Sequence, residues 1–292
     1  MSLKTKINGY VTVIKNRHYY TFLAWFITDI ARIPFYFLPS PDGLKVLDEE
    51  WDYLILLDGC RFDTFEEISD ISGDLKKVRS FGSSTICWLA ENFKDYYEDI
   101  VYVSATPAVS RKVFHGFTGT DHFFEVIDAW RNSDKEFKVT LPDEVTRQAL
   151  NTIKKYPDKR VIIHYEQPHI PYVGKTRILR SDDYDNYNEN LSRIKIWDNE
   201  LIQRAYRDNL RLVLGEVKKL ISAMEPGKKI VITGDHGDHL GKIPFSLHPH
   251  HIHLGMLIDV PWLNVDKEVI GKEYEEMVGK NKLDNIIDNL KI

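Results

Sequence analysis

The sequence predicts an α/β fold, with a mixed, mostly parallel sheet sandwiched between helices. Four short apolar runs end in polar residues or glycine, as strands buried on both faces do; they are 52–58, 100–104, 160–165 and 229–235. Segments between them carry apolar residues at the three- and four-residue spacing of amphipathic helices; they are 86–93, 143–154 and 200–223. Regular alternation of such elements favours a parallel sheet covered on both sides.

Length and composition limit the classes of protein that the chain can belong to. The 292 residues fit one large domain, which we expect at 46–266, between an N-terminal helical appendage at 1–45 and a C-terminal tail at 267–292. A net charge of −5 argues against a nucleic-acid partner, because phosphate backbones select strongly basic surfaces. Cys60 and Cys87 are too few for a disulfide framework. No signal-peptide pattern is found, so we expect a cytoplasmic location, and the oligomeric state stays open.

Segment 19–39 is rich in aromatic residues and almost long enough to span a bilayer, but Asp29, Arg32 and Pro34 interrupt it. We expect an amphipathic helix and turn packed on the catalytic domain. The alternative is that this segment contacts a membrane surface.

Histidines are concentrated in one part of the chain. Eight of the eleven lie between 164 and 253, and they are His164, His169, His236, His239, His248, His250, His251 and His253. Neutral imidazole is a common nitrogen ligand of zinc-like ions, so the cluster favours a divalent metal site. The alternative is solvated loop histidines, an interpretation that we prefer for His239, His250, His251 and His253.

Two acidic residues follow predicted strands. Asp235 and His236 come directly after the apolar run at 229–235, between Gly234 and Gly237, so both side chains can reach one cation. Asp58 ends the first strand, where a buried carboxylate is costly unless it is paired or bound to a metal. Arg61 offers the alternative partner for it.

Two further segments carry polar groups that suit an anionic substrate. Ser84 and Thr85 open the predicted helix, where a hydroxyl either caps the helix or meets an anion beside free backbone N–H groups. A metal-bound hydroxyl at this point is a competent nucleophile. His169 lies between two prolines that make its loop rigid, and His248 precedes Pro249 in the same way.

In their order along the chain, these elements resemble the alkaline phosphatase/sulfatase superfamily, and in particular the short sulfatase-like proteins of archaea. The resemblance covers roughly residues 50–263 and is carried by DGCRFD, SSTICWL, QPHIPY, GDHGDHLG, the HP pair and VPWL. It implies that Asp58, Thr85, Asp235 and His236 hold one divalent metal, Zn or Mn, and that Thr85 is the nucleophile in preference to Ser84. It also implies that His169 and His248 contact the transferred group; His164, His169, His248 and Ser84 would supply a second metal site or bind substrate.

The chain also departs from this family. Neither Cys60 nor Cys87 begins the Cys-x-Pro-x-Arg motif that is converted to formylglycine in true sulfatases, and the Asp-x-x-x-His pair of two-zinc members is not evident. The resemblance implies an enzyme that cleaves a phosphate or sulfate ester through a covalent intermediate. Three alternatives stay open: a phospho-alcohol transferase acting on a surface glycan or lipid, a catalytically silent metal-binding member, and a structural metal site in an unrelated fold.

Overall fold

In the computed structural model the described residues are 3–38, 42–110, 117–178, 191, 192, 194, 198–241 and 251–268. Within them, seven strands form one sheet in the order β2-β7-β6-β1-β5-β3-β4. The strands are β1 Tyr53–Leu57, β2 Gly73–Arg79, β3 Tyr97–Ser104, β4 Phe123–Asp128, β5 Arg160–Tyr165, β6 Ile230–Gly234 and β7 Asp259–Val265. The five strands from β6 to β4 are parallel, whereas β7 runs antiparallel to both β6 and β2.

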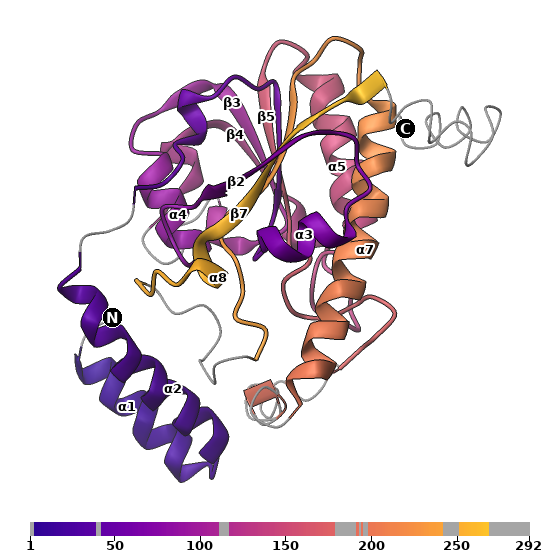
Figure 1. Cartoon of the computed structure of the whole chain (residues 1–292). Helices are drawn as coiled ribbons and strands as arrows, with labels where there is room; N and C mark the ends of the chain where they lie inside the picture. The colour runs from indigo at the N-terminus through magenta and orange to yellow at the C-terminus, as the bar shows by residue number, and fades with distance from the viewer. Residues whose placement is uncertain are drawn as a thin grey trace.

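Helices cover both faces of this sheet (Figure 1), with α3, α5 and α7 on one side and α4 on the other. The α-helices are α1 Leu3–Lys15, α2 Tyr19–Arg32, α3 Phe62–Ile68, α4 Thr85–Asn92, α5 Pro142–Lys155, α7 Asn199–Ala223 and α8 Gly255–Ile258. Short 3-10 helices are η1 Ile33–Tyr36, η2 Val46–Asp48, η3 Pro107–Val109, η4 Gly119–Asp121 and η5 Ala129–Asn132.

Strand β1 lies at the centre of the sheet and is apolar at every position. Because successive side chains point to opposite faces, Ile55 and Leu57 join the core beneath α3, α5 and α7, while Leu54 and Leu56 join the core beneath α4. All four are completely buried. A strand with two covered faces exposes none of its side chains to water, which favours apolar residues along it.

The structure confirms the predicted fold class, and every strand and helix expected from the apolar patterns is present. Strands β2, β4 and β7 and helix α3 were not predicted. Strand β2 lies at the sheet edge and carries Lys76 and Lys77 with mostly exposed positions, so it lacks the apolar run of a central strand.

Residues 3–38 form a helical hairpin that extends away from the sheet (Figure 1). Tyr10 of α1 packs edge-on against Phe22 and Trp25 of α2. Phe35 meets the ring of His253 edge-on at 5.9 Å, so the expected helix and turn do pack against the rest of the chain. Among the described helices, none combines the length and apolarity needed to cross a bilayer.

The central position of β1 makes its side chains the most sensitive to truncation. Ile55→Ala should lower the free energy of unfolding by about 2–5 kcal/mol, and Ile55→Val by about 0.5–1.5 kcal/mol, through lost burial and the cavity left behind. Urea unfolding followed by circular dichroism measures both. Leu212→Ala, at an exposed position of α7, should stay within about 0.5 kcal/mol. Equal effects at positions 55 and 212 would contradict the assigned core.

Candidate metal centre

The carboxyl ends of neighbouring parallel strands bring the two acidic residues together. Leu57 of β1 pairs with Gly234 of β6, and each is followed by an aspartate, so Asp58 and Asp235 leave the sheet side by side. His236 comes next in the chain, and one ligand atom each from Asp58, Asp235 and His236 lies within 4.8 Å of the others. This edge of an open α/β sheet is where ligands generally bind.

His236 is held in the orientation that a metal ligand needs. Its Nδ1 lies 2.7 Å from the carbonyl oxygen of Gly237, which can only accept a hydrogen bond, so the proton is on Nδ1. Nε2 therefore keeps its lone pair and points toward the acids, 3.4 Å from Asp58 Oδ1 and 3.5 Å from Asp235 Oδ2. A backbone carbonyl that fixes the tautomer in this way is a common feature of metal-binding histidines.

The two carboxylates are buried without enough proton donors. Gly59 N–H and His236 N–H donate to Asp235 Oδ1 at 3.1 and 2.9 Å, yet Asp235 Oδ2 and Asp58 Oδ1 have no hydrogen-bond partner among the described residues. Burial and the charge of Asp235 raise the pKa of Asp58 well above its usual range. Two buried acceptors facing an imidazole lone pair are costly unless a cation lies between them. The residues present therefore fit a divalent metal.

Thr85 brings a hydroxyl to the same point. It is the first residue of α4, and its Oγ1 lies 3.5 Å from His236 Nε2. Ser84 is the N-cap in an extended conformation, but its side chain makes no capping hydrogen bond. The N-terminus of α4, with its backbone N–H groups and positive dipole end, therefore faces the acid pair together with a hydroxyl.

His164 stands behind the acids and is completely buried. Its Nδ1 contacts the Tyr102 hydroxyl at 2.9 Å, and its Nε2 is 3.9 Å from an oxygen of both Asp58 and Asp235. Burial lowers the pKa of His164, so the ring is neutral at pH 7. Its side chain is buried beside the two carboxylates, and its role as a second metal ligand or a substrate contact stays a prediction.

His169 lies on a loop fixed by a residue that the sequence analysis missed. The buried side chain of Asn209, on α7, donates to the carbonyl oxygens of Pro168, His169 and Pro171 at 3.0–3.3 Å. Its Oδ1 accepts from the N–H groups of Val173 and Gly174. Asparagine inside a long amphipathic helix carries no signal by which this role could be predicted.

A second group of possible ligands uses the same loop. Asp58, Glu166 and His169 each offer an atom within 4.8 Å of the others, and the His169 N–H also donates to the Asp58 carbonyl at 3.1 Å. The sequence lacks an evident Asp-x-x-x-His pair, but Glu166-x-x-His169 follows β5 and places two possible ligands beside Asp58. The sequence analysis named His169 but not Glu166, although the spacing of two potential ligands directly after a buried strand was a usable signal.

Two alternatives from the sequence are wrong. Arg61 does not pair with Asp58: its Nε donates to Asp63 at 2.8 Å and its Nη1 to the Asp238 carbonyl at 2.9 Å. His239 is not a solvated loop residue, since it is completely buried.

Of the four remaining histidines in the cluster, two lie in the described part of the chain. His251 is exposed, and His253 is partly buried against Phe35, so neither joins the acids. His248 and His250 lie outside the described residues.

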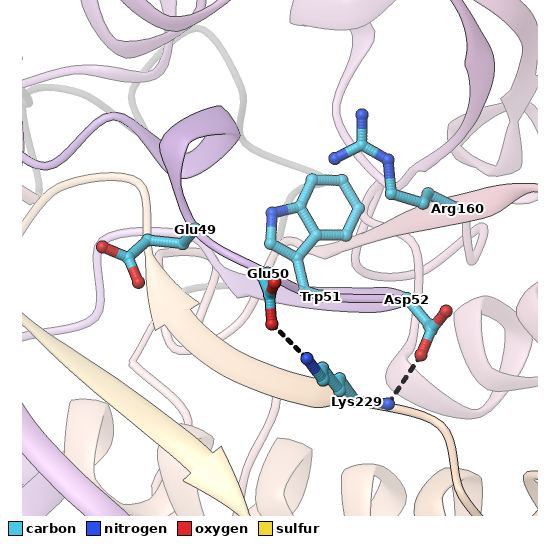
Figure 2. Close-up of a pocket in the computed structure, with 6 residues that line it drawn as sticks. All are labelled: Glu49, Glu50, Trp51, Asp52, Arg160 and Lys229. Atoms are coloured by element: carbon cyan, nitrogen blue, oxygen red, sulfur yellow. Dashed lines mark hydrogen bonds and ion pairs between the residues drawn. The ribbon is translucent and has the colours of Figure 1, made fainter.

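A pocket shown in Figure 2 lies at the amino ends of the central strands, opposite the end that carries the acid pair. Its walls include residues that precede β1 and β6, among them Asp52 and Lys229, and Arg160 at the start of β5. Lys229 forms an ion pair with Glu50, and its N–H donates to Asp52 at 2.7 Å. Lys229 is thus engaged by two acids of the pocket and Arg160 pairs with Asp99 outside it, whereas the candidate metal ligands lie at the other ends of the strands.

Comparison with solved structures supports the alkaline phosphatase-like fold. The chain superposes on lipooligosaccharide phosphoethanolamine transferase A from Neisseria meningitidis, an integral membrane protein, with a TM-score of 0.50 and 15% identity over 81% of this chain. The soluble domain of the same transferase gives a TM-score of 0.51 and 14% identity over 75% of this chain and 78% of that domain. The chain spans about half of the intact transferase, 52% of its length. No family model and no curated protein sequence matches the chain.

The buried acid pair should lower the free energy of unfolding of the metal-free protein. We expect Asp58→Asn to raise the free energy of unfolding of metal-free protein by about 1–2 kcal/mol, because an incompletely paired buried carboxylate is removed. Zinc at a hundredfold excess over Kd should stabilise the wild type by about 2.7 kcal/mol and the variant much less. Urea unfolding with and without chelator measures both.

Asp63→Asn is the matched control, since Arg61 holds the pKa of Asp63 at about 2 and the charge there is compensated. It should lower stability and leave the zinc effect unchanged. Stabilisation of metal-free protein by Asp63→Asn, or none by Asp58→Asn, would contradict the electrostatic argument.

Asn209→Ala should lower the free energy of unfolding by about 2–4 kcal/mol, since it leaves several buried backbone groups without partners. Thermal unfolding measures the loss. Arg204→Ala, at an exposed position of the same helix, should change stability by less than about 0.5 kcal/mol. Comparable shifts for the two variants would show that the loop does not depend on Asn209.

Proposed function

We propose that the chain is a metal-dependent enzyme that cleaves a phosphate or sulfate ester, with Thr85 as nucleophile. The observation that carries the proposal is the meeting of two incompletely paired buried carboxylates, the Nε2 of His236 and the Thr85 hydroxyl at one helix N-terminus. Asp58, Asp235, His236 and Thr85 would hold the metal, which we expect to be Zn or Mn. The closer resemblance to short archaeal sulfatase-like proteins rests on the motifs alone.

A cation held by these residues would lower the pKa of the Thr85 hydroxyl and offset negative charge on the ester. Thr85 would lose its hydroxyl proton to solvent and its Oγ1 would attack phosphorus or sulfur in line, while the bond to the leaving alcohol oxygen breaks and that oxygen takes up a proton. The backbone N–H groups at the start of α4 stabilise the charge on the transferred oxygens. Water then releases the group from Thr85 as inorganic phosphate or sulfate, or as the corresponding monoester when a diester was cleaved.

His169 is suited to bind the transferred group or the leaving alcohol. Its loop is held by Asn209 and by the hydrogen bond to the Asp58 carbonyl, so the ring has a fixed position beside the acids. Such rigidity favours a group that must donate a hydrogen bond or a proton at one place. Glu166, 3.7 Å from His169 Nδ1, would orient the ring or supply a second metal ligand. We assign His248 the role of a further contact with the transferred group.

Transfer to an acceptor is the second candidate. The two structures reported above belong to a phosphoethanolamine transferase, which supports an acceptor alcohol in place of water. The same covalent intermediate would then pass its group to a glycan or lipid hydroxyl. Turnover that requires an added alcohol separates transfer from hydrolysis, and metal binding without turnover on any ester would show a catalytically silent member.

Metal analysis of purified protein, paired with a panel of phosphomonoester, phosphodiester and sulfate esters, tests the proposal. Asp58→Ala and Asp235→Ala should each abolish metal binding and turnover. Full activity in both variants would end the assignment. If metal removal unfolded the chain as a whole, a structural metal site would be the better interpretation.

The nucleophile is tested by trapping the covalent intermediate. Thr85→Ala should lower kcat by roughly three orders of magnitude or more and abolish labelling, whereas Thr85→Ser should stay within about tenfold of the wild type. Mass spectrometry of acid-quenched protein locates the phosphoryl or sulfuryl group. Ser84→Ala is the matched control and should keep the label; its loss there, with retention in Thr85→Ala, would assign the nucleophile to Ser84.

A further inference from the structure

The helical hairpin formed by α1 and α2 exposes apolar side chains in a regular pattern. In α1 these are Ile7, Val11 and Ile14, and in α2 Tyr19, Leu23, Phe26 and Ile30, each 42–61% exposed. The spacing of three and four residues places each set along one face of its helix. The pattern continues past α2, where Phe37 is 85% exposed.

The opposite faces of the two helices are already occupied. Val13, Ala24 and Thr28 are buried, and the rings of Tyr10 and Trp25 meet between the helices. The inward faces of the two helices therefore pack against each other, while a second set of apolar residues faces outward. An exposed apolar stripe of this extent on a water-soluble surface needs a partner.

Charge on the hairpin identifies the kind of partner. Residues 1–38 contain five Lys or Arg and one Asp, although the chain as a whole has a net charge of −5. The single acid, Asp29, is neutralised within the hairpin by Lys6 at 2.6 Å, by Arg32 at 3.5 Å and by the Tyr10 hydroxyl.

Lys4, Lys15 and Arg17 remain exposed on the same unit. Basic groups beside an apolar helical face with aromatic residues match an anionic lipid surface, where the rings enter the headgroup boundary and the cations meet lipid phosphates. At 13 and 14 residues, the helices are too short to span a bilayer but long enough to lie in its interface.

We propose that the α1–α2 hairpin binds the surface of an anionic lipid bilayer. The hairpin is linked to the candidate metal centre through one segment: Ile27, Ala31 and Phe35 pack against the cluster that contains Leu257. The carbonyl oxygen of Leu257 accepts a hydrogen bond from Gly237 N–H, directly after Asp235 and His236. Docking thus brings the centre to esters at the membrane surface, a consequence that rests on the proposed function; binding itself does not.

Sedimentation with vesicles tests this. The full chain should bind phosphatidylcholine vesicles that contain about 30% phosphatidylglycerol at least tenfold more tightly than pure phosphatidylcholine vesicles. Raising NaCl from about 0.1 M to about 0.5 M should weaken the binding, because lipid–protein charge attraction is screened. Equal binding to both vesicle types, or none to either, overturns the proposal.

Two double variants locate the contact. Leu23→Ser with Phe26→Ser removes apolar contact and should weaken vesicle binding about tenfold or more. Lys15→Glu with Arg17→Glu should remove the preference for anionic vesicles while leaving the apolar face intact. Phe124→Ser with Leu212→Ser, at exposed apolar positions outside the hairpin, is the matched control and should bind like the wild type.

If both hairpin variants bind like the wild type, the contact lies elsewhere and the proposal is wrong. A hairpin-dependent dimer in light scattering, without vesicle binding, would assign the apolar faces to a second copy of the chain and also overturn it. Cleavage of a soluble aryl phosphate should be unchanged in the hairpin variants. Conversely, Asp58→Ala should lose cleavage yet still bind vesicles, so failure of the proposed function and failure of docking are separately visible.

Discussion

The candidate metal centre depends most on the side-by-side placement of Asp58 and Asp235 at the ends of two adjacent parallel strands. Pairing of Leu57 with Gly234 dictates that both carboxylates enter the same buried space. Among the described residues neither an arginine nor a lysine pairs with them, since Arg61 is engaged by Asp63 and the Asp238 carbonyl. The fold therefore carries an electrostatic cost at this point, which a bound cation would offset. A site that is costly when empty binds its metal with part of the folding energy of the domain.

Around the acids, separate elements fix each remaining group. The Gly237 carbonyl sets the tautomer of His236, α4 carries Thr85, and Asn209 on α7 holds the loop of His169. These supports come from parts of the chain far apart in sequence, yet all join at the carboxyl edge of the sheet. Positions determined by helices and strands vary less than positions on free loops, which is the condition for a nucleophile and a metal ligand set to act together.

Sequence patterns predicted the centre of the sheet because β1, β5 and β6 each contain a run of apolar residues and end next to chemically distinctive residues. They failed at the edge, where most positions of β2 are exposed, including Lys76 and Lys77, and where Pro261 stands inside β7. The acids, His236 and Thr85 were recognisable because each directly follows or opens a predicted element. Asn209 was not, since its role exists only through contacts that the tertiary fold creates.

The hairpin and the metal centre meet through the segment that contains Leu257, and this has a consequence for how the chain divides its tasks. Under the proposed function, the acid pair, His236 and Thr85 would act alike on any phosphate or sulfate ester. Selection among esters would then come from where the centre is held and from what surrounds it. The proposed lipid-binding hairpin, with an apolar outer face and three exposed cations, would supply that location, and the Gly237–Leu257 hydrogen bond connects it to the candidate ligands. Rigid attachment at this point would favour esters presented at a surface over the same esters free in solution. One binding event at the surface would let the candidate metal centre meet many such esters before the protein dissociates.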